Sequence, residues 1–154
     1  MDDGIMHDGS GKLDNAPDGY TETGYLIVNT YTARGAIPVE GSLVTVFFGD
    51  AAMTSPEAVL TTDESGKTAK LSLPAPPKSI SLLPGGGEGA PPYGIYNISI
   101  IHEGFIPVYD IGVKIFSGVT AIQSADLIPE ILSSPPDNII DDTDYVDETG
   151  DYNL

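Results

Sequence analysis

Residues 24–48 read GYLIVNTYTARGAIPVEGSLVTVFF, which is two strand-like runs joined by a turn that contains glycine and proline. Each run places apolar or β-branched residues at alternate positions, which is the two-residue period of a β-strand. Glycine accepts a positive φ and proline fixes φ, so the joining segment favours a reversal of the chain. The stretch predicts two neighbouring strands, of which Val44 and Val46 are expected in the core. Residues that share one face of the first strand are Leu26, Val28 and Thr30, and those that share one face of the second are Ser42, Val44, Val46 and Phe48.

Five further runs with the same period follow, at 58–62, 66–73, 93–102, 111–116 and 120–128. Seven short strands at hairpin-like spacing predict an all-β, seven-stranded antiparallel sandwich. The expected inward residues of the later runs are Ala69, Leu71, Leu73, Tyr96, Ile98 and Ile100. The expected solvent-facing residues are Thr68, Lys70, Ser72, Asn97 and Ser99.

The chain has 154 residues, with 23 acidic and 6 basic side chains and a net charge of −17. Residues 1–24 carry −5 and residues 129–154 carry −8, so most of the charge lies at the two ends. We therefore expect an acidic flexible segment over 1–23, a sandwich domain over 24–130 and a mobile acidic tail over 131–154. A surface this negative repels phosphate and anionic lipid, which argues against nucleic-acid and membrane partners.

The chain contains no cysteine, which excludes disulfides, thiolate nucleophiles and cysteine-ligated metal centres. Its first residues, MDDGIMHDGSGKLDNAPDG, lack the basic and apolar regions of a secretion signal. No apolar run approaches the ~20 residues of a membrane span. We therefore expect a soluble chain, and its composition leaves the compartment open.

Short motifs occur in a fixed order along the chain. They are Gly24–Val28 followed by Arg34–Val44, then Thr62–Lys67, then Tyr96–Ile100 with Glu103–Phe105. This order resembles the transthyretin-like sandwich of carboxypeptidase-regulatory-like and Cna B-type domains, in which alanine usually stands where this chain has serine after the turn. The resemblance implies a Greek-key connection of the seven strands, as in transthyretin (prealbumin).

A narrower resemblance involves TARGAIPVEGSLVTV (32–46), LPAPP (73–77), IFSGVTAIQ (115–123) and LIP (127–129). These phrases resemble the N-terminal module of clostridial spore cortex-lytic and related peptidoglycan-acting proteins. In those proteins the module accompanies a separate hydrolase or cell-wall-binding domain. The resemblance implies a spore or cell-envelope setting in a Gram-positive bacterium and transfers no hydrolytic activity.

The residue pattern predicts neither an isopeptide bond nor a metal site. Cna B-type domains with such a bond use a lysine in the first strand, whereas Lys12 precedes that strand and Lys114 comes late in the chain. The acidic run 141–148 lacks the glycine and ligand register of an EF-hand. His7 and His102 have no second histidine at ligand spacing. We expect no metal and no cofactor.

Catalytic signatures are also missing, because the chain has no Gly-x-Ser-x-Gly and no His-Glu-x-x-His motif. The glycine loop at 84–89 lacks the lysine of a phosphate-binding loop. Acids at 40, 103, 110 and 126 are candidates for a carboxylate pair. They leave an alternative open: an accessory domain of a hydrolase, or a small carboxylate- or metal-dependent hydrolase, acting on peptidoglycan.

The preferred prediction is a non-catalytic binding or spacer module whose partner is a protein or a cell-wall glycan. Tyr93, Phe105 and Tyr109 are the expected ligand-contact residues, because three aromatic rings near one end of a sandwich form a small stacking surface. The proline- and glycine-rich stretch 74–92 is a second expected contact region, since long irregular loops often carry function.

We expect residues 1–20 and about the last ten residues to be dispensable for stability, because they add charge and almost no core. Limited proteolysis followed by mass spectrometry should end at a folded fragment near 22–132. A trimmed chain that unfolds would show that the ends contribute to the core.

Overall fold

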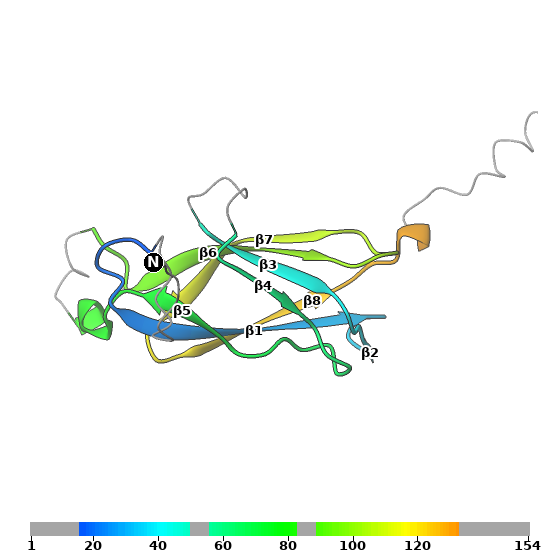
Figure 1. The fold of residues 1–154 in the computed structure, drawn as a ribbon, viewed down its shortest axis with the longest axis horizontal. Helices are drawn as coiled ribbons and strands as arrows, with labels where there is room; N and C mark the ends of the chain where they lie inside the picture. The colour runs from blue at the N-terminus through cyan, green and yellow to red at the C-terminus, as the bar shows by residue number, and fades with distance from the viewer. Residues whose placement is uncertain (1–15, 50–55, 83–88, 133–154) are drawn as a thin grey trace, which may run out of the picture.

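The computed structural model describes residues 16–49, 56–82 and 89–132, which form two four-stranded sheets packed face to face (Figure 1). The strands are β1 (Glu22–Thr32), β2 (Ile37–Pro38), β3 (Leu43–Phe48), β4 (Ala58–Thr61), β5 (Leu71–Ala75), β6 (Tyr93–Ile101), β7 (Val108–Phe116) and β8 (Thr120–Asp126). Two short 3-10 helices are η2 (Lys78–Leu82) and η4 (Glu130–Leu132). In the first sheet β1 has β2 and β5 along one edge and β8 along the other, and the second sheet has the order β4-β3-β6-β7.

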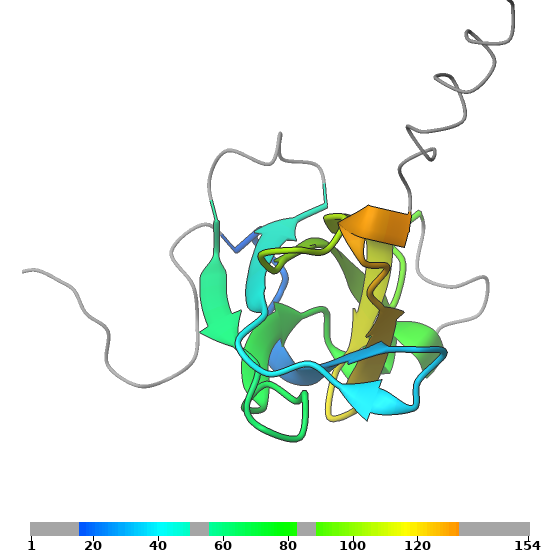
Figure 2. The same cartoon turned by 90° about the vertical axis from the view of Figure 1, so that its right-hand side faces the viewer.

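The predicted all-β architecture is confirmed, with a correction to the direction of one strand. The sequence predicts only antiparallel pairs, but β1 and β8 pair in parallel, from Tyr25 with Thr120 to Tyr31 with Asp126. The chain reverses after β7 and then crosses to the other sheet, so β8 lies beside β1 (Figure 2). A turn signal indicates a reversal and does not specify which sheet the next strand joins.

Several predictions concern residues outside the described part of the chain. Residues 1–15 and 133–154 make up most of the predicted acidic ends, and residues 84–88 make up most of the glycine loop. The acidic run 141–148 and His7 lie there too. The statements made about them from the sequence stay predictions.

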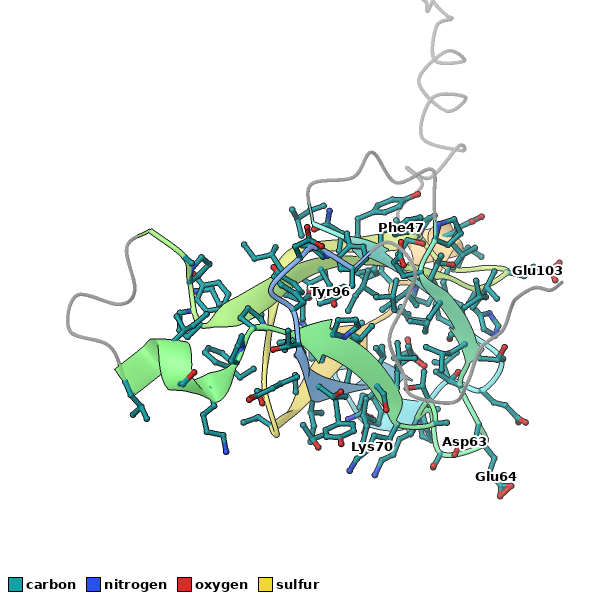
Figure 3. The ribbon with its side chains drawn as sticks, turned by 60° about the vertical axis from the view of Figure 1, so that its left-hand side comes forward. Phe47, Asp63, Glu64, Lys70, Tyr96 and Glu103 are labelled. Carbon is teal, nitrogen blue, oxygen red and sulfur yellow. The ribbon has the colours of Figure 1, made fainter. Side chains whose placement is uncertain are left out.

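The core lies between the two sheets and is built from alternate residues of the strands, with Tyr96 inside it (Figure 3). The predicted core residues Val44, Val46, Ile98 and Ile100 are buried, which confirms the inward faces of β3 and β6. Phe48 and Leu71 are half-buried and pack against the core, and Leu73 is fully buried. The structure also buries Tyr96, as predicted, and one face of β1 with the residue just before β3, namely Leu26, Val28, Thr30 and Ser42.

The prediction is wrong by one residue at the start of the run 66–73, because Thr68 is buried and Ala69 is exposed. Thr68 lies before β5 and bonds to β1 twice. Its backbone N–H donates to Val28 O (2.9 Å), and its Oγ1 accepts from Val28 N (3.0 Å). The hydroxyl therefore points inward to satisfy a buried backbone donor. The regular alternation of β5 begins only at Leu71.

Asn97 and Ser99 are also buried, at 4% and 7% exposure, although the sequence predicts that they face water. Asn97 Nδ2 donates to Gly49 O (3.1 Å), and Gly112 N donates to Asn97 Oδ1 (3.0 Å). Gly112 lies at the irregularity in the β6–β7 pairing, where the register shifts, whereas Gly49 follows the end of β3. The side chain therefore satisfies one backbone group at the bulge and one just beyond β3. It is therefore unavailable as the acceptor of the Asn-x-Ser glycosylation sequon that it begins.

Three buried hydroxyls connect the strands at the β2 end of the sandwich. Thr62 Oγ1 donates to Val39 O (2.9 Å) and accepts from Ser42 N (2.9 Å). Thr30 Oγ1 donates to Val39 O (2.8 Å) and accepts from Ser42 Oγ (3.2 Å). We call Thr30, Ser42 and Thr62 the hydroxyl cluster. It joins β1 to the segments that flank β3 and β4.

The turn between β4 and β5 is organised by Asp63, which lies at the surface of the molecule (Figure 3). Its Oδ1 accepts from Lys67 N (3.0 Å), Ser65 N (2.9 Å) and Ser65 Oγ (2.8 Å). These hydrogen bonds lower the pKa of the Asp63 carboxyl below its usual value. The bond from the Lys67 backbone N–H has the largest effect, followed by the bonds from Ser65. Gly66 ends the turn with φ +78°, where a Cβ would lie 2.4 Å from Thr30 O.

Ile98→Ala and Val46→Ala should each reduce the free energy of unfolding by about 2–4 kcal/mol, because both side chains are fully buried. Val59→Ala is the matched control at an exposed position of β4, and it should change the free energy of unfolding by less than about 0.5 kcal/mol. Urea denaturation followed by circular dichroism measures the three values. Equal losses at Val46 and Val59 would contradict the assigned faces.

Asp63→Asn should lower the melting temperature at pH 7, because an amide oxygen accepts the three donors more weakly than a carboxylate does. The folded state lowers the pKa of Asp63, so the carboxylate stabilises the fold at any pH above the usual pKa of an aspartate. That stabilisation disappears as the pH falls through the lower pKa of the folded state. Melting curves of both proteins from pH 7 to pH 2 should converge at the acid end, and a constant difference would contradict this role.

Candidate binding face

The outer side of the second sheet is apolar although it faces solvent. Even-numbered residues of β6 point into the core, so its odd-numbered residues point outward, and the residues paired with them on β3 and β7 share that side. We call the outer side of β4-β3-β6-β7 the sheet-two face. Its apolar members are Leu43, Val59, Tyr93, Ile95, Ile101, Tyr109 and Phe116, together with Ile111 at the register shift of β7 and Phe47, which is only 6% exposed.

Most of these side chains are accessible. The exposed fraction is 38% at Ile95, 56% at Val59, 59% at Tyr109 and 67% at Ile111. Among the strand residues that the structure describes, Lys114 is the only charged one that pairing places on the sheet-two face. Large contiguous apolar surfaces are uncommon on monomeric proteins and typically mark binding sites. The face is therefore our candidate functional site.

The structure brings two of the three predicted contact residues onto the sheet-two face, at opposite ends. Tyr93 pairs with Phe116 and Tyr109 pairs with Ser99, so the two tyrosines are about 20 Å apart along β6 at ~3.3 Å per residue. Phe105 lies in the β6–β7 turn, where its ring packs edge-on against His102 with centroids 5.2 Å apart. The three rings do not form one stacking surface.

Tyr93 belongs to a local aromatic group at its own end of the face. Its ring centroid is 5.3 Å from that of Phe116, and Lys114 Nζ lies 4.9 Å from the Tyr93 ring centroid. A cation over an aromatic ring restrains both side chains. This end of the face therefore presents two aromatic rings in restrained positions, with one positive charge beside them.

None of the aliphatic residues of the face was predicted as a contact, among them Ile95, Ile101 and Ile111. Runs such as YGIYNISII carry apolar residues at both parities, but only one parity was predicted to face a core. A strand that is apolar on both sides is typical of a sheet covered on both faces. That signal was present in the sequence and indicates a covered outer face.

In the described part of the chain, His102 and Asp126 form hydrogen bonds with backbone groups and not with the other acidic side chains that were candidates for a hydrolase site. His102 Nε2 lies 2.9 Å from Glu40 O and its Nδ1 lies 2.9 Å from Glu103 O, so both ring nitrogens contact backbone carbonyls. Asp126 Oδ1 accepts from Gly35 N (3.2 Å). Over residues 16–49, 56–82 and 89–132, no three histidine or acidic side chains are grouped so as to hold a metal ion.

No helix among the described residues is long and apolar enough to cross a membrane. The stretch 74–92 is partly regular, because residues 74 and 75 belong to β5 and residues 78–82 form η2. The contacts predicted for this stretch stay a prediction.

No protein-family model matches the chain, and a search of curated proteins finds no relative. Among solved structures, it is similar to the Bacillus anthracis TIE protein (16% identity, 70% of this chain and 17% of that one, TM-score 0.47). It is similar to 3-chlorocatechol 1,2-dioxygenase from Rhodococcus opacus (16% identity, 77% and 64%, TM-score 0.46). It is also similar to GBS52, the minor pilin of Streptococcus agalactiae (15% identity, 75% and 46%, TM-score 0.48). The chain spans less than two thirds of each of these proteins, and scores at this level do not establish a shared function.

Proposed function

We propose that this chain is a non-catalytic β-sandwich module that binds, or holds apart, components of a Gram-positive cell wall or spore surface. The observation that carries the proposal is the sheet-two face, an exposed apolar surface with few charges. The setting rests on the sequence resemblance to the module of spore cortex-lytic proteins, and the Greek-key connection rests on the resemblance to transthyretin-like and Cna B-type domains. Neither depends on the solved structures compared above.

The composition of the face favours a protein partner over a glycan. Ile95, Ile101 and Ile111 are aliphatic and offer no hydrogen bonds to sugar hydroxyls. The central polar residues Asn97 and Ser99 are nearly buried. Exposed aliphatic groups between aromatic residues resemble the anchor regions of protein interfaces, in which a few large side chains carry most of the binding energy.

The distribution of charge also favours this face as the contact surface for an anionic partner. The chain as a whole carries −17, whereas Lys114 is the single charge that the described strands place on the sheet-two face. Anionic wall polymers are repelled by the acidic parts of the chain and meet no carboxylate here. Screening beyond a Debye length of about 8 Å at 0.15 M salt reduces that repulsion.

The test measures binding of the full chain to purified Gram-positive peptidoglycan and to spore-coat preparations by co-sedimentation. Tyr109→Ser combined with Ile111→Ser removes two exposed anchors and should weaken binding about tenfold or more. Ile37→Ser is the matched control, because Ile37 is 54% exposed and lies in the first sheet.

Binding to spore coat alone supports a protein partner, and binding to peptidoglycan alone supports the glycan. The proposal fails if the full chain binds neither preparation. It also fails if the double variant binds as tightly as Ile37→Ser while both melt at the temperature of the unmodified chain.

A further inference from the structure

Strand β8 leaves one row of its backbone groups open. Tyr25 N donates to Val119 O (3.0 Å), and Leu127 N donates to Tyr31 O (2.6 Å). In a parallel ladder these two bonds mean that the backbone N–H and C=O groups of the odd-numbered residues in 119–127 point toward β1. The N–H and C=O groups of the even-numbered residues therefore point away from β1. No other described strand pairs with β8.

The other sheet edges carry features that discourage strand pairing. Strand β2 has two residues and includes Pro38, and β5 includes Pro74. Strand β4 has four residues. Strand β7 carries Asp110, Lys114 and a bulge at Gly112, whose φ is +85°. Short length, proline, charge and bulges are the usual protections of an edge.

Strand β8 has none of these protections over most of its length. It has seven residues, TAIQSAD, with no proline and no glycine, and its only charge is at the last position. Ile122 is 63% exposed, and Ser124 is exposed as well. The inward residues are Ala121, which is partly buried against the core, Gln123, which is half-buried, and Ala125, which is buried. The edge is therefore accessible and nearly uncharged.

We infer that the open edge of β8 is a docking site for an extended peptide segment of a partner protein, which adds a strand beside Ile122 and Ser124. Main-chain hydrogen bonds supply the affinity in this mode of recognition, and alternate side chains supply the specificity. The site is separate from the sheet-two face, so it is independent of the function proposed above.

Charge indicates the composition of the segment. The edge ends at Asp126, whose carboxylate is exposed, and the chain carries −17. A strand with alternating lysine or arginine gains attraction on approach, whereas an acidic strand is repelled. A second copy of this chain carries the same negative charge. A basic extended segment is therefore the partner that fits.

The experiment uses the full chain and a synthetic peptide of seven residues with alternating valine and lysine, capped at both ends. Hydrogen exchange followed by NMR reports each backbone amide. In the free chain, Ile122 and Ser124 should exchange fast, and Ala121, Gln123 and Ala125 should exchange slowly. The peptide should protect Ile122 and Ser124. A peptide with glutamate in place of lysine should bind at least tenfold more weakly.

Two matched changes isolate the backbone contribution. Ser124→Pro removes the outward N–H and should weaken peptide binding about tenfold. Ser124→Ala keeps that N–H and should bind as the unmodified chain does. The lysine peptide N-methylated at the amides that face β8 should not bind, which tests the same bonds if the proline variant fails to fold.

The inference fails if Ile122 and Ser124 already exchange slowly in the free chain, because the edge would then be paired. It also fails if the N-methylated peptide or the glutamate peptide binds as well as the lysine peptide. Protection that rises with protein concentration alone would overturn it in favour of pairing between copies. None of these outcomes depends on binding to spore coat or peptidoglycan.

Discussion

Strand β1 is the central strand of the first sheet, so both of its edges need hydrogen-bond partners from segments that are distant in the sequence. Its odd-numbered residues bond to β8. On the other edge Thr30 N donates to Gly66 O (2.7 Å), and Thr30 O accepts from Val39 N (3.0 Å). The segments near positions 39, 66 and 120 must therefore all pack against β1 before its buried backbone N–H and C=O groups are hydrogen-bonded. An unmade bond among these groups costs about 1–3 kcal/mol.

The hydroxyl cluster explains how two irregular segments stay attached to β1 without belonging to a regular strand. Thr30 and Thr62 both donate to the carbonyl of Val39, and Ser42 Oγ donates to Thr30 Oγ1. Aliphatic side chains of the same size would fill the space but leave Ser42 N and Val39 O unsatisfied. The turn that begins at Asp63 brings Gly66 against Thr30, where any larger residue would collide with the backbone. Polar satisfaction thus shapes this part of the core as much as apolar packing does.

The sequence predicts the strands well where one period governs both local shape and burial, as in β1 and in the inner face of β6. It fails at Thr68, because a single hydroxyl bonded to Val28 outweighs the apolar alternation of its neighbours. The parallel direction of β8 depends on which sheet receives the strand, and no local residue determines that. For the candidate site, Tyr93 and Tyr109 were named and share a face, but Phe105 lies in a turn. The aliphatic residues of the face were missed because the run 93–102 was given one core side and one water-facing side.

The parallel pairing of the first long strand with the last has a mechanical consequence. The chain enters β1 at one end of the sandwich and leaves β8 at the other (Figure 1). Tension between the two ends therefore pulls the seven paired positions past each other lengthwise. Hydrogen bonds loaded in this shear geometry share the force and must break together, whereas bonds pulled at one end of a hairpin open one after another. A module with this connection resists stretching along its own axis.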